Sequence, residues 1–122
     1  LDMTRDYVNE RKAFGAPLSK LQNTRFEMAK MYSEFRLNRA LMNECIDLFN
    51  RGELDAATAS MIKYTTTEAQ CSIVDGCLQL FGGYGYMKEY PISRAYVDAR
   101  IQRIYGGTSE IMRELVARAV LD

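Results

Sequence analysis

The sequence predicts an all-α fold, an antiparallel up-down bundle of about four to five helices. Only two prolines and eight glycines interrupt 122 residues, and apolar residues recur at spacings of three and four between the interruptions. No segment shows the strict alternation that is typical of a strand. The length fits one domain. We therefore treat residues 1–122 as a single helical domain, and expect it to be a fragment of a longer chain.

Charge and composition exclude several classes of function. Sixteen Lys and Arg residues balance sixteen Asp and Glu residues, so the chain lacks the positive charge that nucleic-acid binding requires. No stretch approaches the roughly 18 apolar residues of a membrane span. Because the chain has no histidine, Ser-His-Asp and Cys-His catalysis and His-ligated zinc are excluded. We expect no metal site.

Cysteine usage indicates a reducing compartment. Cys45, Cys71 and Cys77 are odd in number and show no CxxC spacing, which argues against a secreted disulfide framework. We expect small, buried thiols on helix faces, the usual place of free cysteine.

The first two helices are expected before residue 52. Leu1 to Tyr7 reads as the middle of an amphipathic helix. A long helix should run from Leu21 to Asn50 and end at Gly52, which follows the cationic Arg51. One apolar stripe should face the bundle and a second should contact another neighbour. The first stripe is Met28, Phe35, Met42 and Phe49 with Met31 and Cys45, and the second is Leu37, Leu41 and Leu48.

A third helix is expected from Leu54 to Phe81, where many small residues allow another helix to approach closely. Gly82 and Gly83 should end it. Pro91 suits the first turn of a shorter helix that extends to Ile101.

The spacing of Arg94 and Asp98 in that shorter helix predicts an ion pair between the two side chains. Thr108 is a good N-cap for the last helix, and Glu110 in its first turn is favourable to the helix dipole. The apolar stripe of this last helix is Ile111, Leu115 and Ala119 with Met112, Val116 and Val120.

Three glycine-containing segments stand out from the helical background. They are RKAFGAPL at 11–18 with Gln22 beyond it, QLFGGYGY at 79–86 followed by EYP, and IYGGTSE at 104–110. With DAR at 98–100 and VAR at 116–118, they resemble the C-terminal helical domain of the FAD-dependent acyl-CoA dehydrogenases, and most of all the long-chain branch. The resemblance extends from about residue 7 to residue 122 and keeps the family's order and spacing.

The resemblance implies two groups of FAD contacts. One group should reach the adenine and pyrophosphate side of the FAD of a neighbouring subunit, and consists of Arg11, Phe14, Gln22, Gln79 and Gly83. The other should contact the FAD of its own subunit, and consists of Thr108 and Glu110. The residue types fit, because arginine binds phosphate in a bidentate manner and glycine lets backbone N–H groups approach a cofactor.

Substrate contacts are expected in the last segment. By resemblance, Tyr105, Gly106 and Gly107 line the acyl pocket, and the N–H of Gly106 donates to the thioester carbonyl. Many family members carry the catalytic glutamate at the position of Gly106, so we expect no catalytic residue in this chain. The favoured base is a glutamate upstream of Leu1. The alternatives are a protein that has lost dehydrogenation, or a base among Glu10, Glu89, Asp98 and Glu110.

The leading functional hypothesis is the C-terminal part of an enzyme that oxidises acyl-CoA to trans-2-enoyl-CoA in fatty acid β-oxidation. The resemblance implies FAD as cofactor, electron transfer flavoprotein as electron acceptor, a dimer or tetramer of the chain, and a bacterial cytoplasm or mitochondrial matrix. The isolated domain should be inactive. One rival is a non-catalytic flavin-binding or scaffold paralogue, and another is a self-contained four-helix bundle.

Overall fold

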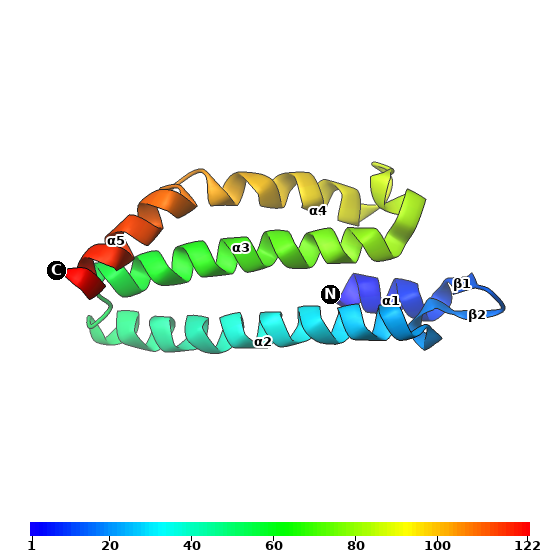
Figure 1. The fold of residues 1–122 in the computed structure, drawn as a ribbon, viewed down its shortest axis with the longest axis horizontal. Helices are drawn as coiled ribbons and strands as arrows, with labels where there is room; N and C mark the ends of the chain where they lie inside the picture. Colours follow the sequence, from blue (N-terminus) through cyan, green and yellow to red (C-terminus); the bar gives the residue numbers. More distant parts are fainter.

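The computed structural model describes residues 1–122 and is a bundle organised around one central helix (Figure 1). The helices are α1 (Asp2–Glu10), α2 (Gln22–Arg51), α3 (Ala56–Phe81), α4 (Pro91–Arg100) and α5 (Ser109–Leu121). Helix α3 lies between α2 on one side and α4 and α5 on the other, and α1 also packs on α3. The expected all-α bundle of five helices is confirmed. No helix combines the length and the apolar character needed to cross a membrane.

Helices α4 and α5 follow each other in the same direction along α3. Near the end of α3, Phe81 clusters with Ile92 of α4, and further back Cys71 Sγ lies 3.4 Å from the carbonyl oxygen of Ala99. A short 3₁₀ helix, η3 (Ile101–Arg103), then leads toward α5, which packs against the first half of α3 (Figure 1). The two helices together form one antiparallel partner of α3.

The helix ends follow local chemistry. Gly52 closes α2 with φ +72°, and the N–H of Glu53 donates to the carbonyl of Leu48 at 2.9 Å, as in a Schellman motif. Asp55 caps α3 by accepting the N–H of Thr58 at 2.9 Å, which places the first residue of that helix two positions after the expected Leu54. Each capping hydrogen bond therefore joins residues at most five positions apart, so the helix ends can be recognised from the local sequence.

A short hairpin contradicts the expectation that the chain has no strand. Strands β1 (Lys12–Ala13) and β2 (Ala16–Pro17) are antiparallel, with Ala13 opposite Ala16. Phe14 and Gly15 form the turn with φ of +53° and +80°, and two positive values are what a tight hairpin turn requires. Strands of two residues are too short to show alternation in the sequence. The hairpin leads into the 3₁₀ helix η1 (Leu18–Lys20).

The core lies where α2, α3 and α4 meet, and it consists of Met31, Cys77, Phe81 and Ile92. The expected stripe of α2 is only partly correct. Met31 and Cys45 are buried, but Phe35 and Phe49 are 37% and 71% exposed. Leu37, on the expected second face, is also exposed. The reason is that α3 is the main neighbour of α2 within this chain, so only one side of α2 is covered.

Other expectations fail where a side chain lacks the assumed neighbour. The Arg94 guanidinium donates to the carbonyl of Lys88 and forms no ion pair with Asp98. Cys71 is only half-buried, whereas the other two thiols are buried as expected. Four of the six residues in the apolar stripe of α5 are open to solvent, because α3 is the main neighbour of that helix; they are Ile111, Leu115, Ala119 and Val120.

Candidate functional site

Arg11, Gln79 and Gly83 line one hollow at the hairpin end of the bundle. The hollow measures about 600 Å³ and is formed by the end of α1, η1, the end of α3 and the 3₁₀ helix η2 (Gly82–Tyr86). Its other lining residues are Tyr7, Leu18, Leu80, Phe81, Gly82, Tyr84 and Met87. The fold thus brings together three of the residues expected to contact FAD, from segments about 70 positions apart.

The guanidinium of Arg11 is exposed and forms no ion pair with a carboxylate of the chain. It lies 5.3 Å from the ring centroid of Tyr84, close enough for a cation–π contact. The backbone of Arg11 is held from both sides, since its N–H donates to Tyr7 and its carbonyl accepts from Leu18, both at 2.8 Å. An immobilised backbone with an unpaired guanidinium suits an anionic ligand.

Stacked aromatic rings support this hollow. Tyr7 stacks on Phe81 with ring centroids 4.0 Å apart, Phe81 meets Tyr90 edge to face, and Tyr90 stacks on Tyr84 at 5.0 Å. Burial raises the pKa of Tyr7 and outweighs the opposite effect of Arg11. Analysis of the sequence did not identify this ring system as a unit. Its signal was the concentration of aromatic residues between 81 and 90.

Phe14 and Gln22 lie apart from the hollow. Phe14 occupies the tip of the hairpin and is 96% exposed, and Gln22 is the exposed first residue of α2. A Cβ added at Gly83 would meet no atom within 4 Å, so its backbone stays open to approach. Within one chain, Phe14 has no ring or cavity to pack against, and the predicted flavin role of both outlying residues stays a prediction.

The second group of expected site residues forms the loop between η3 and α5. Gly106 and Gly107 have φ of +63° and +101°, values that favour glycine. A Cβ at Gly106 would meet no atom within 4 Å, whereas a Cβ at Gly107 would overlap the terminal methyl of Met112. Gly106 therefore faces open space, and Gly107 is held against the first turn of α5.

Three consecutive N–H groups of this loop, those of Gly106, Gly107 and Thr108, have no acceptor within the chain. The Thr108 hydroxyl caps α5 by accepting from the N–H of Ile111 at 3.3 Å. The carboxyl of Glu110 has its pKa lowered by its own backbone N–H and then by the Thr108 hydroxyl. Free amides at a helix N-terminus form a cradle for an anion or a carbonyl oxygen.

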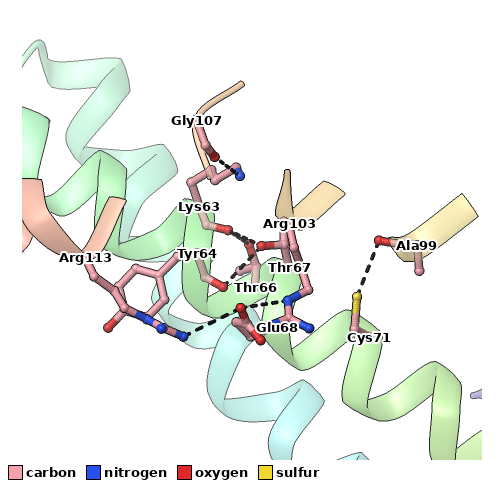
Figure 2. Close-up of polar contacts among 10 residues, drawn as sticks. All are labelled: Lys63, Tyr64, Thr66, Thr67, Glu68, Cys71, Ala99, Arg103, Gly107 and Arg113. Carbon is pink, nitrogen blue, oxygen red and sulfur yellow. Dashed lines mark hydrogen bonds and ion pairs between the residues drawn. The ribbon is translucent and has the colours of Figure 1, made fainter. Parts of the chain in front are cut away.

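Polar side chains of α3 hold this loop from below (Figure 2). Lys63 Nζ donates to the carbonyl oxygen of Gly107. Glu68 Oε1 lies 2.7 Å from Arg103 Nε in η3 and 3.7 Å from Arg113 Nη2 in α5. Burial alone would raise the pKa of Glu68, but the Ser109 hydroxyl and the two guanidinium groups together lower it.

Sequence reasoning missed these α3 residues. The available signal was the presence of Lys63 and Glu68 in a helix otherwise dominated by small and apolar residues, which indicates charged groups that need partners. Nothing in the sequence itself identifies those partners, because Lys63 and Gly107 are 44 positions apart.

No acidic side chain lies at Gly106, the position at which the resemblance leads one to expect a glutamate in many family members. Gly106 offers only backbone, and the four acids considered above are all exposed. Of these, Glu110 is nearest in sequence to the loop, and its lowered pKa makes it a weaker proton acceptor. The upstream base therefore stays the favoured prediction.

The two groups of site residues lie in different parts of the bundle. Gln79 is at the hairpin end of α3 and Lys63, which contacts the Gly107 loop, is sixteen residues earlier, about 24 Å along the helix axis. Figure 1 shows the hairpin at one end and the chain between α4 and α5 well away from it. One chain thus carries two separate candidate binding surfaces.

Comparisons with known proteins agree on one family. A family model described as the C-terminal domain of acyl-CoA dehydrogenase matches residues 1–121. Long-chain specific acyl-CoA dehydrogenase from mitochondria of Sus scrofa is 48% identical over 97% of this chain and 27% of its own length. Acryloyl-CoA reductase (NADH) of Anaerotignum propionicum is 38% identical over 99% of this chain and 31% of its own.

A solved structure shows the same fold. The acyl-CoA dehydrogenase from Geobacillus kaustophilus superposes with a TM-score of 0.96 at 36% identity, over 99% of this chain and 32% of that one. The chain thus spans about a quarter to a third of the relatives and structures that it matches.

Proposed function

Because the chain belongs to the family of acyl-CoA dehydrogenase C-terminal domains, we propose that it is part of an FAD-dependent enzyme that oxidises acyl-CoA thioesters to trans-2-enoyl-CoA. Its role there is to contact FAD, to line the thioester site and to supply an interface between subunits. The observation that carries this proposal is the row of acceptor-free N–H groups from Gly106 to Thr108. Such a row can receive a carbonyl oxygen or an anion, which is what the thioester and the flavin offer.

FAD fits the residues at both candidate surfaces. At the hairpin end, the unpaired guanidinium of Arg11 and the open backbone of Gly83 suit the pyrophosphate, with Gln79 as an additional hydrogen-bond partner. At the other surface, Thr108 and Glu110 stand at the start of α5, where free amides suit a polar edge of the flavin. Bound FAD supplies the acceptor for the hydride that leaves the β-carbon of the substrate.

The Gly106 loop polarises the substrate in this proposal. The N–H of Gly106 donates to the carbonyl oxygen of the thioester, which stabilises the negative charge that develops as the α-proton leaves. Gly106 has no side chain to block this approach, and the space around its Cα is open. Tyr105, which is 58% exposed in this chain, and Gly107 line the acyl pocket beside it. The proton itself is taken by a glutamate outside residues 1–122.

The separation of the two surfaces supports an oligomer. A hollow at one end of α3 and a loop about 24 Å away along its axis serve two FAD molecules more readily than one. We therefore propose that the residues at the hairpin end reach the FAD of a neighbouring subunit; they are Arg11, Phe14, Gln22, Gln79 and Gly83. An apolar groove of about 510 Å³ between α1, α2 and α3 offers further contact surface; among its lining residues are Met28, Phe35, Met42 and Ile73.

The direction of the reaction and its setting follow from the relatives. The long-chain dehydrogenase is more similar to this chain than the acryloyl-CoA reductase is, which favours oxidation over reduction. We propose electron transfer flavoprotein as the acceptor of the electrons. Relatives come from mitochondria and from bacteria, so we propose a mitochondrial matrix or a bacterial cytoplasm.

The decisive experiment is anaerobic bleaching of the flavin by acyl-CoA in the full-length protein. Replacing the upstream glutamate with glutamine should abolish bleaching. Adding Gly106→Glu to that variant should restore part of it, because a carboxylate then stands beside the thioester. Gly106→Gln in the same background is the matched control and should restore nothing. Absence of bleaching in the unmodified protein with any acyl-CoA would refute the proposed function.

A further inference from the structure

The conformation of the Gly106 loop is not determined by the loop itself. Gly106 and Gly107 are adjacent and both have positive φ, and glycine pairs sample many backbone conformations with similar energy. None of the three N–H groups from Gly106 to Thr108 is tied to an acceptor of the chain. If these amides are to point in fixed directions, a group outside the loop must hold them.

Lys63 is positioned to do this. Its ammonium donates to the Gly107 carbonyl (Figure 2), and its side chain is half-buried, so the contact is partly shielded from water. The Gly107 carbonyl and the Thr108 N–H belong to one planar peptide unit. Holding the oxygen therefore fixes the direction of the Thr108 N–H, and the nearby positive charge makes that N–H a stronger donor.

Glu68 fixes the two ends of the same loop. It lies five residues after Lys63 on α3, and its carboxylate pairs with Arg103 before the loop and with Arg113 after it. Arg113 also lies 5.5 Å from the ring centroid of Tyr64, which limits its freedom. Helix α3 therefore holds the loop at its centre and at both of its ends.

We propose that Lys63 is a positioning residue, assisted by Glu68, that fixes the Gly107–Thr108 peptide unit and thereby holds the loop in the conformation that presents the Gly106 N–H to the thioester carbonyl and the Thr108 N–H to FAD. This inference rests on the proposed function. It assigns to α3 the task of holding the substrate-polarising loop in one conformation, while Lys63 itself touches neither the substrate nor the cofactor.

The test uses the full-length holoenzyme with Lys63→Met, which keeps most of the length of the side chain and removes its charge. Hydrogen exchange by mass spectrometry should show the amides of Ile111 and Met112, which donate to Thr108 at the start of α5, exchanging about tenfold faster, because the loop before them is no longer held. Exchange within the rest of α3 should be unchanged. Lys63→Arg, which retains a donor, should restore most of the protection. The matched control is Lys30→Met, because Lys30 is exposed and has only a weak contact with Glu27 at 3.9 Å.

Kinetics then separate positioning from folding. With saturating acyl-CoA, kcat of Lys63→Met should fall about tenfold to a hundredfold while KM and flavin content change little, because misplaced donors weaken the transition state and not the binding of CoA. A cinnamoyl-CoA thioester bound to the variant should show a smaller red shift of its absorbance, which reports carbonyl polarisation.

Unchanged exchange at Ile111 and Met112, faster exchange along the whole of α3, or an unchanged kcat would each overturn the assignment of Lys63. If the unmodified holoenzyme fails to reduce its flavin, the proposed function is refuted. The exchange experiment would still decide whether Lys63 holds the loop.

Discussion

Replacing Gly107 with alanine should destabilise the chain more than the same change at Gly106. At positive φ a Cβ costs about 1 to 2 kcal/mol, and both glycines have positive φ. Only at Gly107 does the new Cβ overlap another atom, the methyl of Met112. Forcing the half-buried Met112 into another rotamer adds about 1 kcal/mol. We expect losses of about 1 to 2 kcal/mol for Gly106→Ala and about 2 to 3 kcal/mol for Gly107→Ala.

The assay is thermal unfolding of the 122-residue chain followed by circular dichroism, in which about 1 kcal/mol corresponds to roughly 4 °C in Tm. Met112→Ala supplies the internal control, because it removes the atom that the new Cβ would overlap. In that background the loss caused by Gly107→Ala should shrink by about 1 kcal/mol, while the loss caused by Gly106→Ala stays the same. Equal losses at the two glycines, or no coupling between Gly107 and Met112, would refute the reasoning.

Three further predictions concern FAD, pH and association. In the full-length protein, Arg11→Ala should weaken FAD binding by about 1.5 to 3 kcal/mol, and Arg11→Lys should weaken it by less. The measurement is the ratio of flavin to protein absorbance after purification, which the control Arg51→Ala should leave unchanged. Full retention of FAD in Arg11→Ala would show that Arg11 is only a surface charge. Because the folded pKa of Glu68 is lowered, its stabilisation is present above the unfolded pKa of about 4.3 and is lost as pH falls through the folded value. Glu68→Gln should therefore lower the free energy of unfolding by about 1 kcal/mol at pH 7 and by progressively less as the pH falls below about 4.3, and a pH-independent loss would contradict this. Sedimentation of the 122-residue chain should show a dimer or tetramer at tens of micromolar, roughly the concentration at which weak helical interfaces associate. The double variant Phe35→Ser, Met42→Ser should lower the fraction of associated chains. A 14.0 kDa species alone would speak against association.

The sequence predicted the helices well because their limits are set by neighbours in the chain. Gly52 and Thr108 end and begin helices through bonds to residues at most four positions away, and Pro91 starts α4 as expected. The three glycine-containing segments can also be recognised as motifs, because the residues of each motif are neighbours in the sequence. The hairpin was missed because its two-residue strands carry no periodic signal.

Contacts between distant segments could not be predicted in the same way. Periodicity places Phe35 and Phe49 on an apolar face, but their exposure depends on which helices cover α2, and within this chain none covers that side. The joining of Arg11 to Gln79 in one hollow likewise depends on how α1 packs on α3. The resemblance to a family supplied the expectation that these segments cooperate, which the residue pattern alone does not contain.

The charged residues of α3 make the same point in terms of energy. Placing Lys63 and Glu68 between helices requires their removal from water, and apolar residues of similar size would pack there at no such penalty. Their partners are a carbonyl and two guanidinium groups that all belong to the chain around the Gly106 loop. Packing between α3 and α5 explains neither residue. The conformation of the loop accounts for both, because apolar contacts do not orient peptide groups, whereas Lys63 and Glu68 bind polar groups in and beside the loop.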